Sequence, residues 1–173
     1  PPTSPSNFVN CVEEYNGTSW SAGGGLIAKN SKPGGAGTQN AAISMGGQTP
    51  AGISTTVEFY NGSSWASGTS IITGRSTGVG SGTQNAAFLA GGLKDSDLTS
   101  SDTEEYNGIS FNIVGSLPTI LVGGAGAGAS SADSMTFGGG TLNPPASTQI
   151  IGNTYIWNCT PVRQGVICFS KTI

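Results

Sequence analysis

Asn16-Gly17-Thr18-Ser19-Trp20 is the first of four similar segments that recur along the chain every 45 or 46 residues. The later copies are Asn61-Gly62-Ser63-Ser64-Trp65, Asn107-Gly108-Ile109-Ser110-Phe111 and a diverged Asn153-Thr154-Tyr155-Ile156-Trp157. A second block, Thr38-Gln39-Asn40-Ala41-Ala42, returns as Thr83-Gln84-Asn85-Ala86-Ala87. These two blocks lead to Gly46-Gly47 and Gly91-Gly92, and Gly138-Gly139 holds the same place in a third unit. A period of about 40 to 50 residues with several short strands per unit is typical of β-propeller blades.

The unit from residue 38 to residue 68 has the pattern of a small antiparallel sheet. Residues 41–45 form an apolar run closed by two glycines, which predicts a strand buried on both faces. Residues 55–60 alternate and are rich in β-branched and aromatic side chains, which predicts a second strand. Asn61-Gly62 predicts a type I′ turn, in which both residues have a positive φ, before a returning strand from residue 63. No segment repeats its apolar residues every 3.6 positions, so we expect almost no helix.

The two halves of the unit occur unequal numbers of times, which bears on how the fold closes. The hairpin half occurs four times and the inner-strand half three times, while residues 163–169 resemble the missing inner strand. We therefore expect residues 163–171 to pair with the strand around residues 11–15, in the same chain or in a neighbour. The predicted fold is all-β, a small β-propeller of about four blades. The alternative is an open array of antiparallel blades completed by neighbouring subunits, since free sheet edges invite pairing with other chains.

The chain divides into a short arm and one repeat domain. Residues 1–8 are rich in proline and serine and are interpreted as an extended arm or a disordered linker. Residues 9–173 form the repeat domain, with units near 9–30, 31–73, 74–115 and 116–173. Because the chain opens on proline rather than methionine, we interpret it as processed or as a fragment. The glycine-rich residues 123–128 lack the Gly-Lys-Ser/Thr ending of a phosphate loop and are predicted to link two units.

The repeated glycine pair, with a tyrosine and a tryptophan beyond it, resembles the kelch repeat. The residues that carry this resemblance are Gly46-Gly47, Tyr60 and Trp65, then Gly91-Gly92, Tyr106 and Phe111. The form at residues 13–20, Glu-Glu-Tyr-Asn-Gly-Thr-Ser-Trp, looks more like kelch-type repeats in phage tail-fibre and virion proteins and in bacterial surface proteins. The resemblance covers about residues 9–160 and implies a propeller. It implies no particular activity, because propellers host many unrelated functions.

Composition narrows the classes of partner. Charged residues make up 9% of the chain, where about 25% is usual, and the net charge is −3. The six lysines and arginines are scattered singly, which argues against nucleic acid. No apolar run is long enough to cross a membrane. We expect the partners to be copies of this chain or other virion or filament proteins, with glycans as a second class, at an extracellular or virion surface.

Catalytic and cofactor chemistry is poorly supported by the residues present. The chain contains no histidine, which removes the usual general base and the usual zinc ligand. We therefore expect no enzyme activity, no cofactor and no metal. Glutamates recur at one place in each unit (Glu13, Glu14, Glu58, Glu104 and Glu105), and we interpret them as solvated or cross-strand residues, with a cation or sugar site as the alternative. A loop with Asp95, Asp97 and Asp102 lacks the EF-hand pattern.

Three further sets of residues are candidate sites. The repeat core is predicted to contain Tyr15, Trp20, Tyr60, Trp65, Tyr106, Phe111 and Trp157, which could alternatively be sugar-stacking platforms. Cys159 could bond to Cys168 across a turn near residues 163–164, or Cys168 could bond to Cys11, or all three could be buried thiols. Disulfides would place the chain outside a reducing cytosol. Asn16, Asn61 and Asn158 begin glycosylation triplets, although the first two are explained equally by the hairpin turn.

These observations predict a non-enzymatic structural subunit of a virion, such as a tail fibre or surface protein, or of an extracellular filament. It would assemble through a sparsely charged β surface. The alternative is a carbohydrate-binding adhesion module. Sugar binding predicts exposed aromatic residues, whereas assembly predicts buried ones.

Overall fold

The computed structural model describes residues 8–95, 98–143, 147–150, 154–162 and 165–172, with the side chains of residues up to 140. Strands account for 51% of the chain, and the described residues contain no α-helix, so the all-β prediction is confirmed. The strands are β1 (Glu13–Tyr15), β2 (Trp20–Ala22), β3 (Gly34–Thr38), β4 (Ala41–Met45), β5 (Gln48–Thr49), β6 (Gly52–Ile53), β7 (Val57–Tyr60), β8 (Trp65–Ser67), β9 (Val79–Thr83), β10 (Ala86–Ala90), β11 (Asp102–Tyr106), β12 (Phe111–Ser116), β13 (Ala125–Ser130), β14 (Asp133–Phe137), β15 (Gly140–Asn143), β16 (Ser147–Ile150), β17 (Thr154–Val162) and β18 (Gly165–Thr172).

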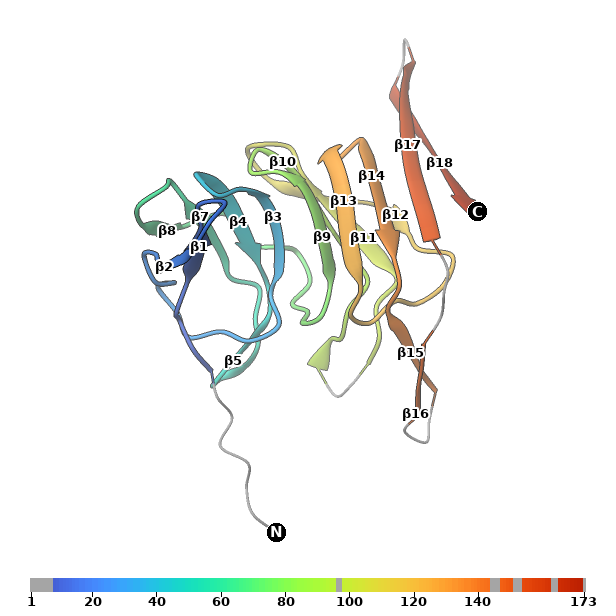
Figure 1. Ribbon diagram of the computed structural model, residues 1–173. Helices are drawn as coiled ribbons and strands as arrows, with labels where there is room; N and C mark the ends of the chain where they lie inside the picture. Colours follow the sequence, from blue (N-terminus) through green and yellow to red (C-terminus); the bar gives the residue numbers. More distant parts are fainter. Residues whose placement is uncertain (1–7, 96–97, 144–146, 151–153, 163–164, 173) are drawn as a thin grey trace.

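The strands form antiparallel sheets that follow one another along the chain. We call β1-β2 unit 1, β3-β4-β7-β8 unit 2, β9-β10-β11-β12 unit 3 and β13-β14-β17-β18 unit 4. The small hairpins β5-β6 and β15-β16 lie between the second and third strands of units 2 and 4. The units stand side by side (Figure 1), with the first strand of unit 3, β9, contacting both β3 and β13.

A glycine-rich segment forms the first strand of units 2, 3 and 4. This corrects the interpretation of residues 123–128 as a linker. Residues 125–130 are strand β13, and Gly34–Thr38 and Val79–Thr83 are its counterparts. A Cβ atom on Gly80 would lie 2.5 Å from the carbonyl oxygen of Gly35, and one on Gly126 would lie 2.5 Å from that of Gly80. The units therefore pack backbone against backbone at this line, which a side chain would prevent.

The glycine pairs of the repeat require glycine for a different reason. In Gly46-Gly47, Gly91-Gly92 and Gly138-Gly139 both residues have a positive φ, between 65° and 101°. The second glycine donates its backbone N–H to the linker entering the next unit, Gly47 to the carbonyl of Arg75 and Gly92 to that of Leu121, both at 2.8 Å. Residues with a Cβ rarely adopt this conformation.

The hairpin loops differ from the predicted type I′ turn. Positive φ occurs at Gly17, Gly62 and Gly108 but at none of the preceding asparagines, among the residues described. The asparagine side chain instead accepts two backbone N–H groups, as Asn61 Oδ1 does from Ser63 (3.0 Å) and Ser64 (2.9 Å). This side-chain hydrogen bonding stabilises a loop of four residues without a left-handed asparagine.

The predicted closure of the fold by its last strand is wrong within the chain. Strand β18 pairs with β17 from Tyr155↔Thr172 to Val162↔Gly165, whereas β1 pairs only with β2 among the described strands. The reason is that residues 154–162, which begin in the diverged copy of the hairpin segment, form one long strand. The residues after it therefore become the outer strand of unit 4. None of the sheets in the described part of the chain closes on itself. Pairing of residues 163–171 with a neighbouring chain stays a prediction.

The hydrophobic core lies between the units. Unit 2 contributes Ile43, Met45 and Val57 to a cluster that unit 3 completes with Ala87, Leu89, Tyr106 and Phe111. A second cluster contains Phe88, Ala90, Leu117 and Leu121. Units 2 and 3 thus bury apolar side chains against each other, as expected of a repeat protein.

Candidate functional site

An aromatic pair recurs in units 1, 2 and 3 with nearly constant geometry. The ring centroids are 5.2 Å apart for Tyr15 and Trp20, 5.0 Å for Tyr60 and Trp65, and 4.9 Å for Tyr106 and Phe111. Tyr60, Tyr106 and Phe111 are buried and Trp65 is half-buried, whereas Tyr15 is 47% and Trp20 67% exposed. The predicted core position therefore holds in units 2 and 3 but not in unit 1.

The exposure of the first pair follows from its place in the array. In the later units the pair packs against the unit before it: Trp65 Nε1 donates to the carbonyl of Gly24 at 2.8 Å, and the Tyr106 ring lies 5.4 Å from that of Phe59. No unit precedes Tyr15 and Trp20 among the described residues, so the surface that the other pairs bury stays open to solvent here.

A hollow of about 300 Å³ lies beside this exposed pair. Its lining includes Glu13, Glu14, Tyr15, Trp20, Gln39 and Tyr60. Glu14 joins units 1 and 2 here, because its carboxylate accepts hydrogen bonds from the Tyr60 hydroxyl and from Gln39 Nε2, the latter at 3.3 Å. The hydrogen bond to Glu14, followed by burial of the ring, raises the pKa of the Tyr60 hydroxyl above its ordinary value.

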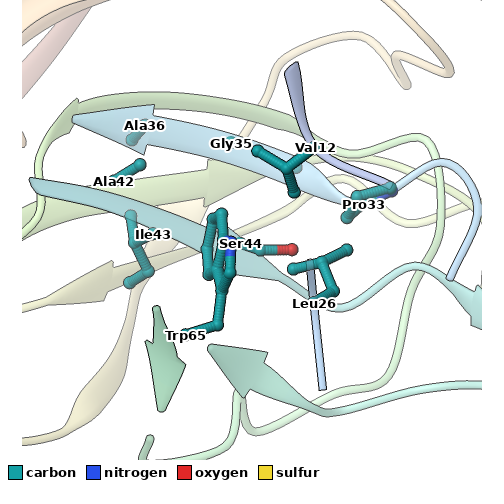
Figure 2. Close-up of a pocket in the computed structure, with 10 residues that line it drawn as sticks. Val12, Leu26, Pro33, Gly35, Ala36, Ala42, Ile43, Ser44 and Trp65 are labelled. Carbon is teal, nitrogen blue, oxygen red and sulfur yellow. The ribbon is translucent and has the colours of Figure 1, made fainter. Parts of the chain in front are cut away.

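Figure 2 shows a second, apolar hollow of about 250 Å³. Its lining residues come from both units and include Val12, Leu26, Pro33, Ala36, Ala42 and Trp65. The two hollows share Val12, Ala42 and Trp65. We call this continuous surface, from Trp20 across Val12 to Gly35, the first-unit flank.

Glu58 and Glu104 are not the solvated residues that we expected, whereas Glu13 is exposed as predicted. Glu58 is 3% exposed and accepts the backbone N–H groups of Ile27 (2.8 Å) and Ala28 (3.1 Å). Glu104 is fully buried and accepts those of Ile72 (2.6 Å) and Thr73 (3.0 Å). Each carboxylate therefore holds the linker that enters its own unit. The sequence indicated this role in one way: Glu13, Glu58 and Glu104 recur with the same spacing as the repeated motifs.

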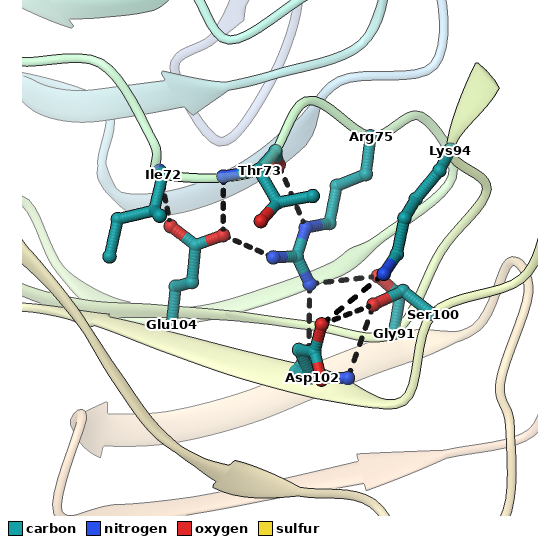
Figure 3. A network of polar contacts seen from close by, with 8 residues as sticks. All are labelled: Ile72, Thr73, Arg75, Gly91, Lys94, Ser100, Asp102 and Glu104. Carbon is teal, nitrogen blue, oxygen red and sulfur yellow. Dashed lines mark hydrogen bonds and ion pairs between the residues drawn. The ribbon is translucent and has the colours of Figure 1, made fainter.

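Arg75 completes this network in unit 3 (Figure 3). Its guanidinium forms an ion pair with Glu104, and both side chains are inaccessible to solvent. Its Nη1 also donates to the carbonyls of Asp102 (2.8 Å) and Gly91 (3.4 Å), and its Nε donates to that of Thr73 at 3.2 Å. Unit 2 has Asn30 in this place, where Nδ2 donates to the carbonyl of Gly46 at 2.8 Å. These buried polar residues were missed at the level of sequence.

The other acidic candidates are dispersed. Glu105 accepts a hydrogen bond from Ser131 of unit 4. Asp102 contacts Lys94 at 3.4 Å and Ser100 at 3.2 Å, and Asp97 lies outside the described residues. No group of three or more Cys, Asp or Glu side chains is placed to hold a metal within the described part of the chain. Nor do those residues contain a helix long and apolar enough to cross a membrane.

The C-terminal candidates are placed by backbone register alone. Cys159 lies directly opposite Cys168, whereas Cys11 is an exposed free cysteine, which does not support a Cys11–Cys168 bond.

Trp157 lies opposite Ser134, just as Tyr106 lies opposite Ala87 in unit 3. It is therefore not the counterpart of Phe111, which corrects its assignment. The side chains of residues 157–168, including Asn158, lie outside the described part.

Comparison with known proteins adds to the description of the fold. No protein-family model and no curated protein sequence matches the chain. Among solved structures, that of YjhT is similar, with a TM-score of 0.70 and 12% sequence identity over 92% of this chain and 51% of YjhT. The chain thus spans about half the length of YjhT. At this identity the likeness concerns the fold alone.

Proposed function

We propose that the chain is a non-enzymatic structural subunit of a virion (a tail fibre or surface protein) or of an extracellular filament. In this proposal its units are blades of a kelch-like β-propeller, and copies assemble through a sparsely charged β surface. The burial of Tyr60, Tyr106 and Phe111 supports an architectural role for the repeated aromatic residues. The buried Glu58 and Glu104 support the same view, because their carboxylates are occupied by backbone N–H groups.

The observation that carries the assembly proposal is the outer strand of unit 3. Strand β12 ends its sheet, and its other edge has no partner among the described strands. Ile113 and Val114 on this strand are 55% and 41% exposed, and Ile109 in the preceding loop is 79% exposed. An apolar, uncharged edge strand is a template for pairing with another chain. With only 9% charged residues, little repulsion opposes such association.

Sedimentation velocity at micromolar concentration tests this proposal. We expect the chain to form a defined oligomer and Ile113→Lys to shift it towards monomer. Ser67→Lys is the matched control, because Ser67 lies opposite Glu58 on β8 as Ile113 lies opposite Glu104 on β12. A wild-type chain that stays monomeric, or equal effects of the two lysines, would contradict assembly through this edge.

Carbohydrate binding is the second candidate, and the exposed Tyr15–Trp20 pair favours it. Aromatic faces beside carboxylates and an amide provide stacking surfaces and hydrogen-bond acceptors for a sugar. A glycan array followed by titration of tryptophan fluorescence tests this function. Here Trp20→Ala should abolish binding and leave the sedimentation profile unchanged, whereas Ile113→Lys should do the reverse. Failure to bind any glycan would leave assembly as the proposal.

A further inference from the structure

Units 2 and 3 share three features that a full four-stranded unit has and that can be compared with unit 1. The third strand of each unit, β7 or β11, pairs on one side with the second strand, β4 or β10. Its glutamate accepts two N–H groups of the entering linker. Two large side chains of the second strand, Ile43 and Met45, fill the space towards the next unit.

Unit 1 presents the same features without their partners. Strand β1 pairs with β2 alone among the described strands, so its other edge is free. Glu13 lies opposite Ala22 as Glu58 lies opposite Ser67. However, Glu13 is exposed and has no hydrogen-bond partner among the described residues. The first-unit flank therefore carries a strand edge and a carboxylate whose counterparts are occupied in the later units.

The apolar hollow lies at the position that Ile43 and Met45, the side chains of a second strand, fill at the next junction. Val12 and Leu26 line it from unit 1, and Ala42 and Trp65 line it from unit 2. Their counterparts at the next junction, Val57, Ile71, Ala87 and Phe111, surround Ile43 and Met45 in the core cluster. A hollow of 250 Å³ thus replaces the two apolar side chains of a second strand.

Gly35 marks the path of the first strand. Its counterparts Gly80 and Gly126 meet the backbone of the preceding strand within 2.5 Å of an added Cβ. An added Cβ on Gly35 would meet nothing closer than the carbonyl of Ile43 at 3.9 Å. The side of β3 that would receive a preceding glycine-rich strand is therefore open.

From these vacancies we infer that the first-unit flank binds a β-strand pair of the chain's own repeat type. In this complex a glycine-rich strand lies along Gly35, and an apolar strand adds to the free edge of β1 in antiparallel register. Its large side chains enter the hollow, and its linker N–H groups and an arginine approach Glu13, as Arg75 approaches Glu104. An intact second copy cannot supply this pair, because its own second strands are already paired with β7, β11 and β17. The inference is independent of assembly through β12.

A synthetic peptide of residues 70–92 tests the inference, since it contains the linker with Arg75, both strands and no tryptophan. Titration into the chain should give saturable one-to-one binding, detected by a change in the fluorescence of Trp20 and Trp65. A peptide with Phe88→Asp is the control, because it places a charge in the apolar hollow. That control should bind at least about tenfold more weakly, the equivalent of about 1.4 kcal/mol.

Two variants of the chain locate the peptide. Gly35→Val should abolish binding and leave the thermal midpoint unchanged, because an added Cβ at this exposed position meets no atom closer than 3.9 Å. Glu13→Gln should weaken binding by about tenfold through loss of a charge-assisted acceptor. Absence of peptide binding, equal binding by the Gly35→Val chain, or equal binding of the Phe88→Asp peptide would overturn the inference. Self-association that Gly35→Val abolishes in the absence of peptide would assign the flank to a second copy and also overturn it.

Discussion

Replacing Glu104 with glutamine should be among the most destabilising conservative changes in this chain. Glu104 and Arg75 are both inaccessible to solvent, and the glutamate carboxylate also accepts the N–H groups of Ile72 and Thr73. Glutamine keeps the shape but loses the charge, and its amide N–H₂ group turns towards groups that are themselves donors. The guanidinium of Arg75 is then a buried cation that keeps only carbonyl partners.

The expected magnitude comes from the cost of leaving one member of a buried ion pair alone. That cost is about 3 to 5 kcal/mol, against a total stability of about 5 to 15 kcal/mol for a domain. Unit 2 provides the matched control, since Glu58 holds its linker in the same way with Asn30 in place of the arginine. Glu58→Gln strands no cation, so we expect only about 1 to 3 kcal/mol for its weakened hydrogen bonds.

Urea unfolding followed by circular dichroism measures both variants, and urea is chosen because it does not screen charges as guanidinium does. The double variant Arg75→Asn/Glu104→Gln removes the stranded cation and should lose less than the sum of its two single variants. A loss below about 1 kcal/mol for Glu104→Gln would refute a buried pair at this position. So would a loss no larger than that of Glu58→Gln.

Three further perturbations test other parts of the fold. Gly80→Ala should lower the free energy of unfolding by about 1 to 3 kcal/mol through its backbone clash, whereas Gly35→Ala should leave the urea midpoint unchanged; equal effects would contradict the close strand packing. The folded state raises the pKa of the Tyr60 hydroxyl. The stability that this hydroxyl contributes is therefore complete below pH about 10 and is lost as pH rises further. Stability measured from pH 8 to pH 11 should therefore fall more steeply in the wild type than in Tyr60→Phe, and parallel curves would count against the Glu14 hydrogen bond. Gly62→Ala, at a φ of 89°, should cost about 1 to 2 kcal/mol by thermal unfolding, and no loss would mean that the loop relaxes.

The recurrence of short motifs was enough to predict an all-β chain of repeated units. Strand β4 and the glycine pair that closes it follow from local chemistry, because an apolar run and two residues at positive φ act within a few positions. The aromatic residues at Tyr60 and Tyr106 were predicted to be buried because a repeat buries its apolar face only against the next one. These features depend on interactions between residues close in the sequence or on the spacing of the repeat. The sequence alone contains both kinds of information.

The tertiary structure decided the features that depend on distant partners. Strand β13 has no apolar alternation, and its strand conformation became evident only where Gly126 meets the backbone of unit 3. From the sequence, Glu104 was predicted to be a solvated or cross-strand residue. In the structure its carboxylate accepts N–H groups from a linker more than thirty residues earlier. The pairing of β18 with β17 was not predicted, because similarity to an inner strand does not reveal which strand of the same chain lies beside it. Trp20 carries the same motif as Trp65 yet is exposed, because burial depends on the unit packed against a residue and not on the residue itself.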